Sequence, residues 1–172
     1  LGLSSDGYQI EFVHRLSDSD AQALIQLTDS TNDILGGRLR LTANSIRKYF
    51  NYPKTFPFIA RQNKRPVGCI IGVPLEFFNK ESWVKCDVHW GSGNTVYTFA
   101  FILEPAFRKP NYTQSFKKLY INWMDKRGFK YITGHTLSGR RSQFQANATM
   151  VKKFDNWQNS RQTFEYFRLE LP

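Results

Sequence analysis

Residues 95–128 read TVYTFAFILEPAFRKPNYTQSFKKLYINWMDKRG and contain the segment that decides the fold. Positions 95–103 are apolar on both faces, which is typical of a central strand covered by helices on both sides. From position 116 onward, apolar side chains recur with helical spacing, and Gly128 stands where a helix often ends in a left-handed residue. The segment therefore predicts a buried strand, a polar loop and an amphipathic helix that begins near Asn111.

Strands and helices alternate on both sides of this segment. Ser17 with Asp20 resembles a capping box ahead of a helix, and residues 42–52 predict a second helix that ends before Pro53. Period-two patterns and turn residues predict strands at residues 8–16, 56–61, 67–78, 83–90, 129–137 and 163–171, with a further helix at residues 143–154. The order predicts one domain, residues 1–172, of mixed α/β (α+β) class.

The chain carries a net charge of +10 over 172 residues. Residues 1–33 hold one arginine and six carboxylates, so they contribute −5, and the remaining residues carry +15. Such a field favours polyanionic partners, either a phosphate-rich cofactor or a nucleic acid, while solubility alone is an equally good explanation.

Composition excludes several classes of protein. Hydrophobic residues make up 41% of the chain, which suffices for a folded core, and no apolar run reaches the roughly 18 residues of a membrane span. Cys69 and Cys86 cannot form a disulfide framework or a four-cysteine zinc site. The three histidines, His14, His89 and His135, are not spaced along the sequence as metal-ligating histidines usually are. We therefore expect a cytoplasmic protein without a metal site.

The loop between the central strand and the following helix is a candidate phosphate site. The first backbone N–H groups of a helix lack partners within the helix and, with its dipole, favour an anion. Arg108 and Lys109 precede this helix and add positive charge. No Walker motif and no GxGxxG follows a strand, so nucleotide hydrolysis and dinucleotide binding are not supported.

The same segment resembles the GNAT superfamily of acyl-CoA-dependent N-acyltransferases. In that family a central strand ends in a V-x-P-like step, followed by (Q/R)xxGx(G/A) and a helix. Here the strand ends at Leu103-Glu104-Pro105, and Arg108 matches the first position of the motif. Asn111 and Thr113 replace the two glycines, which makes the loop a degenerate version of the motif. The predicted order of elements matches the family from Tyr8 to Leu171, with residues 83–90 as an additional strand.

The resemblance implies a central, mixed and mostly antiparallel sheet flanked by helices on both faces. It implies direct transfer of an acyl group from acetyl-CoA or another acyl-CoA to an amine acceptor. Asn147 resembles the family's Asn on the helix after the fifth strand, and Phe154 stands where the family often has a proton-donating Tyr. The implied cofactor-binding residues are Leu103, Arg108, Lys109, Asn111, Tyr112, Thr113, Gln114, Ser115 and Asn147.

Acyl transfer to an amine also needs a proton acceptor, because an ammonium group is not nucleophilic. Asp87 and His89 share one face of the strand predicted at residues 83–90, so they are candidate bases, although a structural or exposed role is the commoner one for such residues. Tyr112 is a candidate proton donor, and a backbone N–H near Leu103 would polarise the acyl carbonyl.

Two further functions fit the same sequence. The positive charge and the aromatic residues Trp83, Trp90 and Tyr112 also suit a GNAT-like protein that modifies or binds tRNA or DNA. The altered glycine positions and Phe154 also suit a catalytically degenerate member that serves as an interaction module. The sequence leaves the acceptor, the acyl chain and the oligomeric state open.

Overall fold

The computed structural model describes residues 2–3, 7–31, 41–140 and 144–172. These residues form two compact units. Unit 1 comprises Leu1–Gly72 and Phe99–Tyr120, and unit 2 comprises Val73–Thr98 and Ile121–Pro172. The boundaries between the units fall within three elements, β4, β5 and α3. The expectation of one domain over residues 1–172 stays a prediction.

Unit 1 is built on antiparallel strands. Strands β1 (Gly2–Leu3), β2 (Tyr8–Phe12), β3 (Phe56–Gln62) and β4 (Arg65–Pro74) pair in that order, and β4 is followed by β5 (Thr95–Leu103). The β3–β4 hairpin turns at Asn63 and Lys64, which both adopt positive φ. Five strands therefore lie side by side in unit 1.

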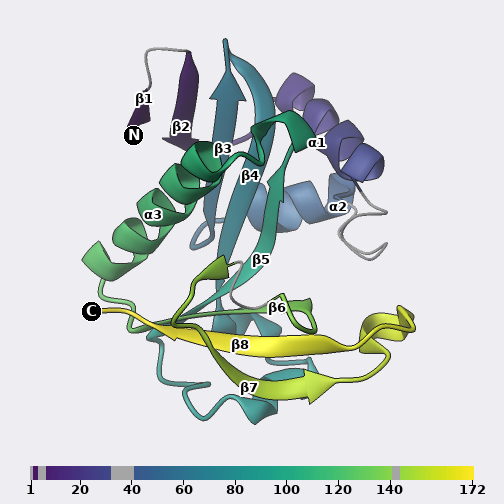
Figure 1. Ribbon diagram of the computed structural model, residues 1–172, viewed down its shortest axis with the longest axis vertical. Helices are drawn as coiled ribbons and strands as arrows, with labels where there is room; N and C mark the ends of the chain where they lie inside the picture. Colours follow the sequence, from purple (N-terminus) through teal and green to yellow (C-terminus); the bar gives the residue numbers. More distant parts are fainter. Residues whose placement is uncertain (1, 4–6, 32–40, 141–143) are drawn as a thin grey trace. The chain divides into compact units, whose positions relative to one another are not determined.

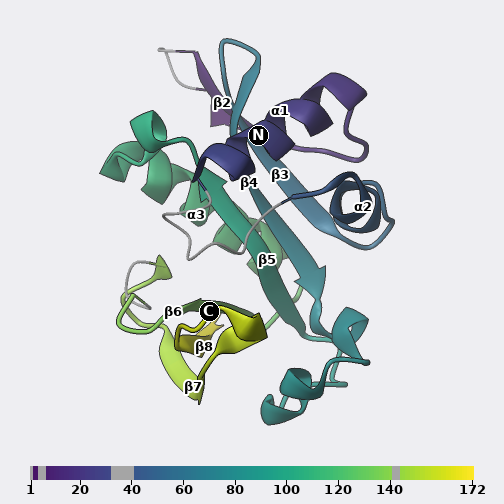
Figure 2. The same cartoon turned by 90° about the vertical axis from the view of Figure 1, so that its right-hand side faces the viewer.

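Helices cover both sides of the unit 1 strands. Figure 1 shows α1 (Asp18–Thr31) and α2 (Ala43–Ser45) on one side, and α3 (Pro110–Lys126) on the other, and Figure 2 faces α1 and α2. The side chain of Ser17 accepts a hydrogen bond from the Asp20 N–H at 3.2 Å, so the predicted start of the first helix is confirmed. Helix α2 continues as the π-helical turn η2 (Ile46–Phe50) and begins with a capping box at Thr42.

The unit 1 core is aromatic on the side that α3 covers. Tyr120 on α3 packs edge-on against Phe58 of β3, with 5.8 Å between ring centroids, and Phe116 packs against Phe101 of β5 at 6.0 Å. On the other side, Tyr49 of η2 stacks on Phe99 at 4.0 Å. Phe99 and Phe101 would share a face in a regular strand. The two rings nevertheless contact different elements, η2 and α3.

Unit 2 contains the remaining strands of the eight-stranded sheet and includes a parallel pair. The first half of β5 pairs in parallel with β6 (Tyr131–Leu137), with Tyr97 opposite Thr133. Strand β8 (Phe164–Glu170) lies between β6 and β7 (Thr149–Phe154), antiparallel to both. A parallel pair needs a crossover connection, and α3 supplies it between β5 and β6. The mostly antiparallel mixed sheet therefore agrees with the predicted fold class.

Two predicted elements are wrong. Residues 83–90 form the short 3₁₀ helix η4 (Ser82–Cys86) and turns rather than a strand, because Trp83 and Val84 turn into the core of unit 2. The helix predicted at residues 143–154 is largely the strand β7, whose pairing with β8 decides its conformation. The start of that prediction, residue 143, lies outside the described residues.

The other predictions hold with small shifts. The expected strand at residues 67–78 ends at Pro74 and continues as the 3₁₀ helix η3 (Leu75–Phe78). A 3₁₀ turn η5 (Pro105–Phe107) and the single turn η6 (Trp157–Asn159) complete the elements that the structure describes.

Candidate active site

The loop that leads into α3 presents the predicted phosphate-binding residues. Strand β5 ends at Leu103, η5 follows, and α3 begins at Pro110. The Thr113 N–H donates to the Lys109 carbonyl at 3.1 Å, which makes Lys109 the residue before the first helical turn. The N–H groups of Asn111 and Tyr112 therefore lie in the first turn, where no carbonyl of the helix precedes them. Pro110 contributes no donor, so this helix end offers fewer amides than one without proline.

Arg108 is positioned by the end of the central strand. Its Nε donates to the Leu103 carbonyl oxygen at 2.9 Å, and the residue is half-buried. Lys109 next to it is exposed. Two cations therefore precede the helix end, one fixed against the strand and one in solvent.

The side chains of the first helical turn differ in their surroundings. Asn111, Gln114 and Ser115 are exposed, while Thr113 is half-buried. The Thr113 hydroxyl oxygen is buried and has no hydrogen-bond partner among the described residues. The ring of Tyr112 packs on Tyr8 at 4.6 Å between centroids, so it contributes to the core of unit 1 as well as to the loop.

These residues fit a phosphate-bearing cofactor. The loop combines the N-terminal end of α3, two cations and a buried hydroxyl that has no hydrogen-bond partner among the described residues, all within unit 1. Side chains at Asn111 and Thr113 occupy the positions where the GNAT motif has glycine, so the approach of an anion to the backbone is more restricted than with glycine.

Asp87 lies at the centre of a buried polar cluster in unit 2. Its side chain is 0% exposed and accepts three hydrogen bonds: from the Tyr166 hydroxyl at 2.6 Å, from Nη2 of Arg168 at 2.7 Å and from the His89 N–H at 2.9 Å. Burial, and then the hydrogen bond to Asp87, raises the pKa of Tyr166 well above its ordinary value, so Tyr166 remains a donor. Because both carboxylate oxygens are engaged, the geometry gives Asp87 a positioning role in this unit.

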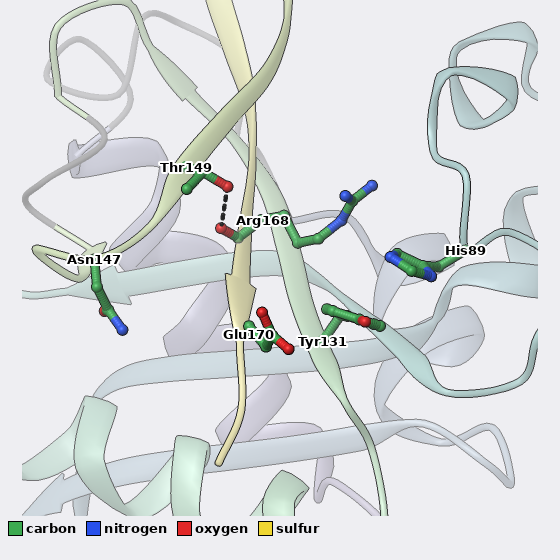
Figure 3. Close-up of a pocket in the computed structure, with 6 residues that line it drawn as sticks. All are labelled: His89, Tyr131, Asn147, Thr149, Arg168 and Glu170. Carbon is green, nitrogen blue, oxygen red and sulfur yellow. Dashed lines mark hydrogen bonds between the residues drawn. The ribbon is translucent and has the colours of Figure 1, made fainter.

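His89 and Asn147 line a polar pocket of about 340 Å³ in unit 2. Figure 3 shows them with the other lining residues, Tyr131, Thr149, Arg168 and Glu170. The His89 ring stacks on Tyr131 with 3.9 Å between centroids. The GNAT resemblance implied that Asn147 lies on a helix, and this is wrong. Asn147 is an exposed turn residue ahead of β7. The structure thus brings His89 and Asn147 together, and it separates the roles of Asp87 and His89.

A second histidine has the geometry of an acid–base residue. Nδ1 of His135 lies 2.8 Å from the Tyr97 hydroxyl, and Nε2 is buried without a hydrogen-bond partner among the described residues. Burial lowers the pKa of His135 to about 3, which keeps the imidazole neutral at pH 7. When Nδ1 carries the proton and donates it to Tyr97, Nε2 presents a lone pair. Nε2 therefore carries a lone pair without a hydrogen-bond partner among the described residues, but it is a weak base while it is buried, and accepting a proton from an amine requires contact with water or substrate that raises this pKa.

Aromatic rings surround this histidine. Trp157 stacks on the His135 ring at 3.7 Å between centroids, and Trp83 meets it edge-on at 5.0 Å. Phe154 and Tyr166 complete the ring contacts at 5.2 and 5.0 Å. Phe154 is the last residue of β7 and packs against His135. The segment between Asn147 and Phe154 is therefore a strand and not the predicted helix.

Other site classes find little support. Among residues 2–3, 7–31, 41–140 and 144–172, no group of three metal-ligating side chains could hold an ion, and no helix is long and apolar enough to cross a bilayer. Cys69 is buried and burial raises its pKa to about 12, which disfavours the nucleophilic thiolate.

Comparison with solved structures decides the fold class. FeeM, an N-acyl amino acid synthase from uncultured soil microbes, matches with a TM-score of 0.74 and 11% identity over 96% of this chain and 90% of its own. A chain of the NatC complex bound to Gag peptide and CoA matches with a TM-score of 0.70 and 14% identity, covering 96% of this chain and 99% of that chain. A GCN5-related N-acetyltransferase from Kribbella flavida gives 0.66 and 12%, covering 98% and 100%. This chain has the GNAT fold. The sequence itself matches no protein-family model and no curated protein.

Within the GNAT fold, sequence analysis missed Tyr97 and His135. Tyr97 was interpreted only as part of an apolar core strand, and His135 only as one of three histidines far apart in the sequence. The available signal was that both stand on strands joined by one helix, which favours a parallel pair. The register that brings the two side chains together comes from pairing alone, with Tyr97 opposite Thr133.

Proposed function

We propose that this protein is an acyl-CoA-dependent N-acyltransferase that transfers an acetyl or other acyl group directly to an amine acceptor. The observation that carries the proposal is the Tyr97–His135 pair, which leaves one imidazole nitrogen open on a GNAT-fold strand. The structural neighbours are acetyl- and acyltransferases, and one of them was solved with CoA.

The α3 loop would hold the cofactor through its phosphates. First-turn N–H groups of Asn111 and Tyr112, the Thr113 hydroxyl and the cations Arg108 and Lys109 would bind them, as the fit of this loop to an anion supports. Exposed Gln114 and Ser115 extend the same face toward solvent. When bound, acyl-CoA supplies a thioester, a carbonyl group activated for attack by an amine. The Leu103 N–H remains our candidate donor to that carbonyl oxygen.

His135 would make the acceptor nucleophilic. Once Nε2 contacts water or the acceptor, its pKa rises from about 3 and it takes a proton from the ammonium group, directly or through water, while Nδ1–H donates to the Tyr97 hydroxyl and fixes the tautomer. Attack of the resulting amine on the thioester carbonyl forms the C–N bond and breaks the C–S bond; the nitrogen loses its second proton to solvent, and the CoA thiolate that leaves takes up a proton. Tyr112 stays our candidate donor of that proton, and Asp87 would act by holding Tyr166 beside His135.

The test separates cofactor binding from chemistry. We expect acetyl-CoA and CoA to bind in a calorimetric titration, and Arg108→Ala to weaken both by about 10- to 100-fold, since a charge-assisted contact contributes about 1.5–3 kcal/mol. His135→Gln should bind CoA normally and lose about 10²–10⁴-fold in the rate of thiol release with a panel of amines.

The control is Lys126→Ala, which removes a cation at the other end of α3. If neither ligand binds at millimolar concentration, the enzyme proposal fails. Binding of tRNA or DNA with a steep log-linear salt dependence would then favour the nucleic-acid-directed alternative.

A further inference from the structure

The connection between β7 and β8 places Trp157 directly on His135. The two rings are nearly parallel, with 17° between their planes and 3.7 Å between centroids. Trp157 also meets Phe154 at 5.1 Å and Trp83 at 5.9 Å. The indole therefore covers the imidazole whose Nε2 has no partner among the described residues.

The backbone of this connection is strained. Asn156, Gln158, Asn159 and Arg161 all adopt positive φ, between 48° and 62°, although none of them is glycine. Asn tolerates this region, whereas Gln and Arg rarely occupy it. Strain of this kind persists where surrounding contacts hold it, and it is typical of segments that change conformation.

Most hydrogen bonds of the connection join its own residues, and one anchors its end, because the Ser138 N–H donates to the Thr163 carbonyl at 3.0 Å. The Arg161 N–H donates to Oδ1 of Asn156 at 2.8 Å, and the Thr163 hydroxyl donates to Asp155 at 2.7 Å. The Trp157 N–H donates to the Gln162 carbonyl at 3.2 Å. The bonds of residues 156–162 would move with the segment about the anchored end at Thr163, so the aromatic contacts of Trp157 are what open first.

We propose that residues 155–163 form a lid that opens by lifting Trp157 off His135, so that the amine acceptor reaches Nε2. The role of the acceptor rests on the proposed function, whereas the movement of the lid does not. Opening removes the stacked indole and exposes the nitrogen to water, and closing removes water from it again. Access to the base is therefore set by the ring contacts of one residue, Trp157, in a strained connection.

Chemical modification of the protein alone tests the lid. Diethyl pyrocarbonate acylates neutral, accessible imidazoles, and mass spectrometry resolves modification at His135 from that at His14 and His89. His14 is exposed and His89 is half-exposed, so they serve as internal references. We expect His135 to react at least tenfold more slowly than His14, and Trp157→Ala to raise the His135 rate about tenfold or more.

Three variants keep the result specific. Trp90→Ala removes a partly exposed indole on another loop of the same unit and should leave the His135 rate unchanged. Trp157→Phe retains a covering ring and should give an intermediate rate. Gln158→Asn relieves strain in the closed form, because Asn accepts positive φ more readily, and should slow the modification.

An unchanged His135 rate in Trp157→Ala, or an equal increase in Trp90→Ala, would overturn the lid. A faster rate in Gln158→Asn would contradict the role of strain in opening. The modification experiment contains no CoA and no amine, so its result does not depend on catalysis. A protein that transfers no acyl group would refute the proposed function and leave the result on the lid unchanged.

Discussion

The hydroxyl of Tyr97 lies 2.8 Å from Nδ1 of His135, and this contact joins neighbouring parallel strands, β5 and β6. The contact fixes the orientation of the imidazole, and burial among aromatic rings keeps it neutral. A buried neutral histidine makes the free energy of unfolding depend on pH. Its state can therefore be measured without knowledge of the acceptor.

The free energy of unfolding should fall as the pH is lowered from 6.5 toward 3. The pKa of His135 is about 3 in the folded protein, against about 6.5 in an unfolded chain, so the unfolded state binds the proton more readily in this range. Each pH unit below 6.5 costs about 1.4 kcal/mol, or about 2 kcal/mol between pH 8 and pH 5. Urea unfolding of the wild type and of His135→Gln measures this. An equal pH dependence in both proteins would refute the assignment.

Asp87→Asn should destabilise the protein by about 3–5 kcal/mol, because it leaves the partly buried guanidinium of Arg168 without its charged partner. Denaturant unfolding measures the change. Glu104→Gln is the matched control, since it breaks an ion pair with Arg65, which is 58% exposed, and should cost less than about 1 kcal/mol. Similar losses in the two variants would show that Asp87 does not organise unit 2.

Thr113→Val should weaken binding of CoA without destabilising the free protein. The hydroxyl is buried and has no partner among the described residues, so an isosteric methyl group removes an unsatisfied polar atom and leaves stability equal or slightly higher. We expect a loss of about fivefold to tenfold in affinity by calorimetry, the range of one hydrogen bond. Unchanged affinity would remove Thr113 from the cofactor site.

Gly68→Ala should destabilise the protein by about 1–3 kcal/mol through overpacking. An added Cβ would lie 2.5 Å from the Ile102 carbonyl oxygen and 2.5 Å from Cδ2 of Leu103, and the carbonyl cannot move without shifting β5. Because Leu103 ends the strand before the cofactor loop, CoA affinity should fall as well. A thermal melt that coincides with the wild type would show that β4 and β5 are further apart here.

The sequence predicted the elements that have a clear local signal, either a periodic apolar pattern or a helix cap. The strand at residues 95–103 and the helix after it follow from apolar patterning, and the helix after Ser17 follows from its cap. It also located the loop around Arg108, because a charged stretch between strand and helix is a local feature. The errors at residues 83–90 and 143–154 occurred where alternation or helical spacing was overruled by packing and strand pairing.

Local patterning therefore predicted most of the order of elements and the fold class, and it singled out the candidate cofactor loop, since periodicity and helix ends act over a few residues. Tertiary structure alone decided which histidine meets a tyrosine, that Asp87 is buried among three donors, and that Trp157 covers His135. These contacts join residues up to 81 positions apart in the chain, and they depend on strand register, which no short stretch of sequence encodes.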